Sequence, residues 1–182
     1  MVEIIVMSPG HELWNPTMEF AENCSWRAGS YLASKMRNRE FEPNERVLAA
    51  IQDRRIVGFC TYANRDELPK GLDFTPFIGF MFVDEKYRGQ RIPEKLTDAA
   101  CDCAGQQGYS GIFVLSGERG LYEKYGFAKI GDYQTIYDTV DQLFFKAIPH
   151  NSGAQIAQSE FSSDCPKIQG NTLCISEDFW AI

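Results

Sequence analysis

The chain has few of the residues that build metal sites. Its 182 residues include only two histidines, His11 and His150, and six cysteines without a Cys-x-x-Cys pair. Cys101 and Cys103 stand two apart on a predicted helix, where their side chains point in different directions. We therefore expect reduced structural thiols and no metal site.

Long apolar runs and an excess of positive charge are also missing. The chain opens on a short apolar run without a basic segment, and no later stretch reaches transmembrane length. The formal net charge is -7, which argues against general nucleic-acid binding because phosphates require a basic surface. These absences predict a cytoplasmic protein with no membrane or nucleic-acid partner.

The composition that remains is that of a globular protein, with 44% hydrophobic and 24% charged residues. We expect one compact domain over residues 1–148. Residues 149–182 begin with a polar loop and end in an apolar tail that contains Phe179 and Trp180. An exposed apolar tail is a liability, so we expect it to dock on the domain or on a partner subunit.

The first third of the chain predicts a strand followed by two helices. Residues 2–7 are typical of a strand, and Asn15 and Pro16 are typical of a helix start. Ser25 is expected to cap a second helix. The buried stripe of that helix would consist of residues at four-residue spacing, namely Ala28, Leu32 and Met36.

The middle of the chain predicts a sheet. Residues 46–51 and 56–62 form a predicted antiparallel hairpin, and the almost continuously apolar residues 77–83 form a central strand covered on both faces. A helix that begins at Pro93 and stops at Gly108 leads to a strand over residues 109–115. Strand, helix and strand at this spacing make a βαβ unit with parallel strands, so we expect a mixed α/β sheet. A short helix ending at Gly126 and a strand over residues 141–148 complete the prediction.

A basic turn between the central strand and the helix is the best candidate binding site. Arg88, Gly89, Arg91 and Lys95 lie just before or within the first helical turn. The N–H groups and positive dipole end of a helix favour phosphate. A solvated basic face and a simple glycine turn would also explain these residues. The P-loop pattern GxxxxGK[ST] and the dinucleotide pattern GxGxxG after a strand are absent.

The order of these motifs resembles the GNAT superfamily of acyl-CoA-dependent N-acetyltransferases. The central strand ends at Val83 and is followed by the turn of residues 87–93, which is similar to the family's [RQ]xxGx[GA] turn. Residues 121–127 then resemble its tyrosine motif before a Gly-Phe pair. The resemblance covers about residues 2 to 148 and implies a mixed α/β fold with a mostly antiparallel twisted sheet, one parallel βαβ pair and flanking helices.

The resemblance also implies an activity and a set of site residues. It implies an acyltransferase that moves acetyl from acetyl-CoA to an amine, with Tyr122 as the acid that protonates the leaving sulfur. It places the pantetheine arm on backbone groups of Met81 and Val83. The residues that it places around the pyrophosphate are Arg88, Gly89, Gln90, Arg91, Ile92 and Pro93. A homodimer is one assembly that the resemblance allows.

This sequence departs from the family pattern at two small residues of the turn. Arg91 and Pro93 occupy these positions, and Pro93 has no N–H to offer a phosphate. Proline suits the start of a helix, and the Arg91 guanidinium could supply the missing contact. The alternative function is a catalytically silent acyl-CoA sensor or scaffold, with these two residues as signs of decay.

The general base and the acceptor amine are left open. Asp84, Glu85, Glu118 and a chain of waters are the alternatives for the base. Aromatic residues could shape the acceptor pocket, namely Trp14, Trp26 and Phe80. The acidic protein favours a cationic amine through field steering. A protein N-terminus, a lysine, a polyamine and an amino sugar all remain open.

Overall fold

The computed structural model describes residues 1–149, which form a seven-stranded sheet with three α-helices. The α-helices are α1 (Trp14–Asn23), α2 (Ala28–Asn38) and α3 (Ile92–Gln106), and two short 3-10 helices are η1 (Glu85–Tyr87) and η2 (Tyr122–Tyr125). The strands are β1 (Glu3–Met7), β2 (Arg46–Gln52), β3 (Arg55–Ala63), β4 (Phe77–Val83), β5 (Gly111–Ser116), β6 (Ala128–Gln134) and β7 (Val140–Ala147).

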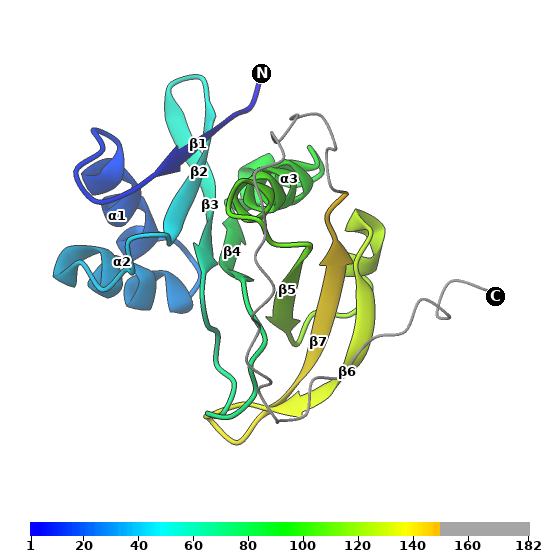
Figure 1. Cartoon of the computed structure of the whole chain (residues 1–182). Helices are drawn as coiled ribbons and strands as arrows, with labels where there is room; N and C mark the ends of the chain where they lie inside the picture. The colour runs from blue at the N-terminus through cyan, green and yellow to red at the C-terminus, as the bar shows by residue number, and fades with distance from the viewer. Residues whose placement is uncertain (150–182) are drawn as a thin grey trace, which may run out of the picture. The chain divides into compact units, whose positions relative to one another are not determined.

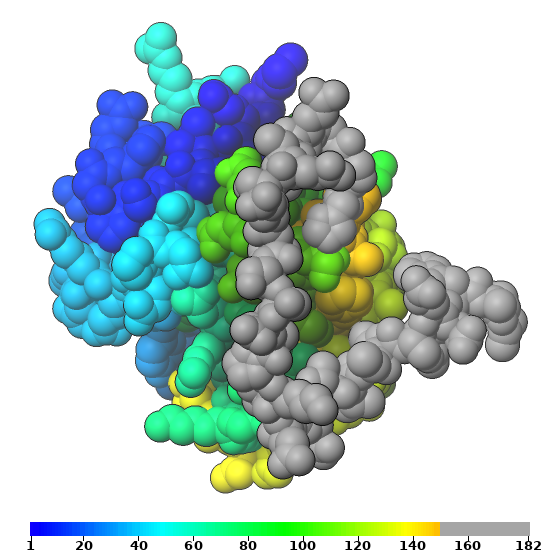
Figure 2. All heavy atoms as spheres, viewed as in Figure 1, coloured from blue at the N-terminus to red at the C-terminus, as the bar shows by residue number. Residues whose placement is uncertain are grey.

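The sheet has the order β1-β2-β3-β4-β5-β7-β6. Every neighbouring pair is antiparallel except β4 and β5, which are joined through α3 and run parallel. The predicted mixed α/β fold with a mostly antiparallel sheet and one parallel pair is confirmed. Strand β1 forms one edge of the sheet and is followed by α1 and α2, whereas β7 and β6 complete the sheet at the other edge. These two parts of the chain lie on opposite sides of the domain in the space-filling view (Figure 2).

Helices cover both faces of the sheet (Figure 1). Leu48 and Ala50 of β2 pack in one core cluster with Leu96 of α3, whereas Val47 and Ala49 pack in the other with residues of α1 and α2. Successive side chains of a strand point to opposite faces, and here both faces are buried. This is why β2 and β4 are almost continuously apolar.

Aromatic rings close the sheet where β4 and β5 meet. The Phe113 ring lies 5.8 Å from that of Phe77, 5.2 Å from that of Phe74 and 5.0 Å from that of Phe145, between ring centroids. Such tilted contacts add to the stabilisation from buried area. The cluster therefore fixes β4, β5 and β7 together at this end of the parallel pair.

One prediction about the elements was wrong, and one strand was not predicted. Ser25 does not cap α2, whose N-cap is Arg27 without a side-chain cap; instead the Ser25 hydroxyl donates to Glu85 Oε1 at 2.5 Å. Strand β6 was not predicted because it is an exposed edge strand with a register shift between Lys129 and Gly131. Edge strands lack the buried alternation by which a strand is recognised.

Within residues 1–149 no helix is long and apolar enough to cross a membrane. The predicted polar loop and apolar tail lie, from residue 150 onward, outside the residues that the structure describes.

Candidate functional site

A cavity of about 940 Å³ opens where β4 and β5 separate. The two strands are registered only at Phe77 and Phe113. The cavity is lined by residues 78–83 of β4 on one side and by residues 115–118, at the end of β5 and just beyond it, on the other. The edge of β4 beyond Phe77 is thus left without a strand partner on this side, so its backbone groups are available to a ligand.

A bulge shapes this free edge. Phe59 and Thr61 of β3 pair with Phe82 and Gly79 of β4, so two residues of β4, Phe80 and Met81, stand opposite one residue of β3. Phe80 has a φ of 47°, in the left-handed region that non-glycine residues seldom adopt. Bulges bend a strand and redirect its groups. The predicted pantetheine residues Met81 and Val83 both line the cavity.

The basic turn follows the end of β4 at Val83. Some of its residues line the cavity and others do not. Arg88, Gly89, Arg91 and Pro93 line the cavity. Gln90 is exposed but is not among the lining residues, and Ile92 is fully buried in the core beneath α3. Ile92 therefore anchors the helix through its side chain, and only its backbone N–H could meet a phosphate.

The two arginines of the turn are held by carboxylates. Arg88 Nη2 lies 3.1 Å from Glu85 Oε1, and Arg91 Nε lies 2.5 Å from Glu94 Oε2. Both arginine side chains are largely exposed. Exposed ion pairs contribute little to stability, so a phosphate could replace the carboxylate at small cost. The hydrogen bond from Ser25 is the main cause that lowers the pKa of Glu85, with a smaller contribution from the Arg88 charge.

Arg91 keeps the backbone conformation of a glycine. It forms the N-cap of α3 with a φ of 55° and a ψ of 30°. A left-handed conformation costs a residue with a Cβ roughly 1–2 kcal/mol. Pro93 stands at the start of the helix, as predicted, but at its second residue. The turn therefore holds Arg91, a residue with a Cβ, in a conformation that favours glycine, at the expense of backbone strain.

Arg91→Gly should consequently stabilise the domain, whereas Arg91→Ala should not. Both variants lose the exposed ion pair with Glu94, but only glycine removes the cost of the positive φ, roughly 1 kcal/mol. Thermal unfolding without ligand should place the glycine variant a few degrees above the alanine variant. Equal midpoints would show that the turn relaxes freely and that Arg91 is not strained.

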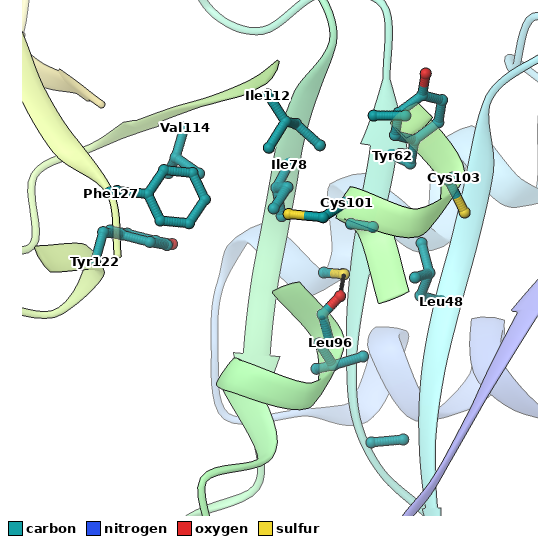
Figure 3. Packing of buried hydrophobic residues seen from close by; sticks show 14 of the residues in the cluster. Leu48, Tyr62, Ile78, Leu96, Cys101, Cys103, Ile112, Val114, Tyr122 and Phe127 are labelled. Carbon is teal, nitrogen blue, oxygen red and sulfur yellow. Dashed lines mark hydrogen bonds between the residues drawn. The ribbon is translucent and has the colours of Figure 1, made fainter. Parts of the chain in front are cut away.

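Tyr122 reaches the same cavity from η2. It is 5% exposed and its ring packs against Phe127 at 5.8 Å and Phe144 at 5.6 Å. Figure 3 shows Tyr122 beside Phe127 and Val114 at the edge of the core. Burial raises the pKa of the phenol well above its ordinary value, and the Ser116 hydroxyl partly opposes this. The phenol is therefore a proton-bearing donor at every physiological pH.

Carboxylates line the cavity. Besides Glu85, they are Asp66, Glu67, Glu118 and Asp141. Asp66 and Glu67 belong to the loop between β3 and β4, and burial raises the pKa of Asp66 to about 7. The sequence predictions included Glu118 and missed the other three. The loop of residues 64–76 has no periodic pattern from which its path could be predicted. Its two adjacent carboxylates, shortly before the central strand, were the one sequence signal that could have marked them as site candidates.

The other predicted candidates lie in different places. Trp26 and Phe80 line the cavity with ring centroids 6.3 Å apart. Trp14 is buried under α1, where its indole N–H donates to Met36 O at 3.2 Å, so its assignment to the acceptor pocket was wrong. Asp84 accepts from the backbone N–H of Lys86 and caps η1.

Residues 43–129 match the family model described as an acetyltransferase (GNAT) domain. This match supports the resemblance of the described domain to the GNAT superfamily. The GNAT match begins just before β2 and ends in β6, so it includes Asp66, the basic turn and Tyr122. A search of curated protein sequences gives no match.

Solved GNAT structures share the fold at low sequence identity. An aminoglycoside 6'-acetyltransferase type Ii is 16% identical with a TM-score of 0.63, covering 81% of this chain and 97% of its own. An aminoglycoside 6'-N-acetyltransferase complexed with coenzyme A is 15% identical with a TM-score of 0.60, covering 87% and 99%. An Escherichia coli GNAT N-acetyltransferase in complex with CoA is 21% identical with a TM-score of 0.59, covering 83% and 85%. These likenesses show that the described domain shares the fold of these acetyltransferases.

Proposed function

We propose that the protein transfers the acetyl group of acetyl-CoA directly to an amine. The observation that carries the proposal is that one cavity contains the free edge of β4, the N-terminal turn of α3 and the buried Tyr122. These groups meet three requirements of the reaction: a site for an anionic carrier, donors for a carbonyl oxygen and a proton for a leaving thiolate.

Each part of the cavity has a role in this proposal. Arg88, Gly89 and Arg91 hold the CoA pyrophosphate together with the free N–H groups of the first turn of α3. Met81 and Val83 pair with the pantetheine arm through their backbone groups, and an N–H of this strand holds the thioester oxygen. The amine forms its bond to the acetyl carbon, the carbon–sulfur bond breaks, and Tyr122 donates its proton to the sulfur.

The thiols of the described domain argue for direct transfer. None of the four cysteines within residues 1–149 lines the cavity. Burial raises the pKa of Cys60 and Cys103, and of Cys101 to about 11. A nucleophilic cysteine needs thiolate character and access. An acyl-cysteine intermediate has no support among these residues.

The carboxylates of the cavity indicate a cationic amine as the acceptor. Asp66, Glu67 and Asp141 add negative charge to the lining of the cavity, and an ammonium group would be attracted there. Two structures with the same fold are those of aminoglycoside acetyltransferases. A cytoplasmic location and a homodimer stay predictions from the sequence.

The proposal predicts that acetyl-CoA both stabilises the protein and reacts. At a hundred times its Kd, acetyl-CoA should add about 2.7 kcal/mol to the free energy of unfolding. Incubation with acetyl-CoA and an amine library should release free thiol with at least one amine. A blank without amine corrects for the protein's own cysteines. Stabilisation without thiol release from any amine would contradict catalysis and favour the acyl-CoA sensor.

A further inference from the structure

Asp66 is placed over the central strand by the loop that follows β3. The backbone N–H of Glu67 donates to Asp66 Oδ1 at 2.8 Å. The Oδ2 atom lies 3.6 Å from the position that a Cβ on Gly79 would occupy. Within residues 1–149 no group donates to this Oδ2 atom. Thr61 Oγ1 lies 3.0 Å from the same Cβ position. Asp66 and Gly79 both line the cavity, so an unpartnered carboxylate oxygen stands close to the backbone of β4 in the cavity wall.

The loop that carries Asp66 is fixed by the backbone. The N–H of Leu68 donates to Asp66 O at 2.8 Å, and the N–H of Ile136, in the turn between β6 and β7, donates to Glu67 O at 2.9 Å. This loop and that turn lie side by side at the end of the domain remote from α3 (Figure 1). The carboxylate is thus held in position before a substrate enters, as a catalytic group must be.

The surroundings of Asp66 combine burial with charges of both signs. Burial is the main cause that raises the pKa of Asp66 to about 7, and the Glu67 N–H partly opposes it. The Glu67 charge from the same loop and the Asp141 charge from β7 raise this pKa further, whereas the Lys35 charge from α2 lowers it. The pKa of this half-buried carboxyl group therefore lies closer to neutral pH than that of an ordinary aspartate.

We propose that Asp66 is the general base that takes the proton from the acceptor ammonium before attack. The proposal rests on the acetyl transfer proposed above. Asp66 accepts one proton from the ammonium and releases it later to solvent. The free amine attacks the acetyl carbon, the carbon–sulfur bond breaks, and Tyr122 gives its proton to the sulfur. The second proton leaves the new amide nitrogen and restores the phenol, directly or through water.

The carboxylates considered from the sequence are less suited to this role. Asp84 caps η1, and Glu85 is bound by Ser25 and Arg88. Glu118 is exposed to solvent, and no contact within the described residues fixes its carboxylate. Asp66 combines a fixed position in the cavity with a pKa close to the operating pH, which is where a general base works best. Glu67 and Asp141 act through it as positioning residues that adjust its proton affinity.

The test compares Asp66→Asn with Asp102→Asn, a change at an exposed residue of α3 that does not line the cavity, using spermidine and an aminoglycoside as strongly basic acceptors. Asp66→Asn should lower kcat/KM at pH 7 by at least about tenfold, whereas Asp102→Asn should leave it nearly unchanged. Binding of acetyl-CoA, measured by calorimetry, should be retained in both. With hydroxylamine, which is unprotonated at pH 7, the defect of Asp66→Asn should largely disappear. Equal rates of Asp66→Asn and wild type with the basic acceptors would overturn the role of Asp66.

The pH profile gives a readout that a purely structural role would not move. Because the carboxylate must be ionised, wild-type kcat/KM should rise through a pKa of about 7. Glu67→Gln removes a charge that raises this pKa, so the rise in kcat/KM should shift to lower pH. Lys35→Gln removes a charge that lowers this pKa, so the rise should shift to higher pH. A rise in kcat/KM that neither variant shifts, or that persists in Asp66→Asn, would contradict the assignment.

Carboxyl NMR titration of the same variants makes the inference independent of the acceptor. The Asp66 resonance should titrate near neutral pH and shift in opposite directions in Glu67→Gln and Lys35→Gln. An Asp66 that titrates near its ordinary value would overturn the inference while leaving acetyl transfer intact. If wild type acetylates no amine, the proposed function fails and the inference fails with it.

Discussion

Tyr122→Phe is expected to lower turnover by about a hundredfold or more. The change removes one hydroxyl group and keeps the ring that packs against Phe127 and Phe144. The departing thiolate then lacks its donor, whereas the CoA contacts remain. Turnover with saturating acceptor measures the loss, and the Kd of acetyl-CoA should change little. Turnover equal to that of wild type would assign Tyr122 to packing.

The pH dependence of this defect distinguishes an acid from a structural residue. Because burial raises the pKa of Tyr122 above its ordinary value near 10, the phenol keeps its proton to higher pH than a free tyrosine. Wild-type turnover should therefore not fall through ionisation of this group as the pH approaches 10. At low pH, solvent can protonate the thiolate, so the defect of Tyr122→Phe should shrink.

Gly58→Ala is expected to destabilise the domain by roughly 1–3 kcal/mol and to weaken acetyl-CoA binding. A Cβ on Gly58 would stand 2.7 Å from Phe82 O and 3.0 Å from Val83 Cγ2. The end of β4 must then shift. This end contains Met81 and Val83, which are proposed to pair with the pantetheine arm, and it leads into the basic turn. Thermal unfolding and calorimetric binding of acetyl-CoA measure the two effects.

Gly105→Ala provides the matched control. A Cβ there would meet only Ile148 Cγ2 at 3.5 Å, an ordinary contact, and Gly105 lies in α3. Alanine favours the helix, so this variant should be as stable as wild type or slightly more stable. If both alanine variants unfold at the wild-type temperature, the close approach of β3 to β4 does not constrain the strand.

The sequence predicts the elements that are buried or bounded by clear signals. The apolar run of residues 77–83, the helix after Pro93 and the strand that follows are found almost as predicted because burial on two faces and a βαβ spacing leave few alternatives. The short helix before Gly126 is a 3-10 helix. The edge strand β6 could not be predicted because exposure removes the alternation that marks a strand.

Some residues of the candidate site could likewise be predicted from the sequence, and others could not. Positions that follow from motif order, such as Met81, Arg88 and Tyr122, line one cavity. The position of Asp66 depends on the path of the loop after β3. That loop is held by a hydrogen bond from the N–H of Ile136 to Glu67 O, and these two residues lie more than sixty positions apart in the chain. The conformation of Arg91 and its pairing with Glu94 are likewise properties of the folded turn.

The separation of β4 and β5 beyond Phe77 and Phe113 also bears on the kinetics of ligand entry. The aromatic cluster keeps the parallel pair closed at one end, so the open end exists before any ligand arrives. A carrier that lies along β4 replaces water on backbone groups that are already exposed, and no strand has to detach. Association should therefore proceed as docking to a rigid surface, and differences in affinity among carriers should reside mainly in their residence times.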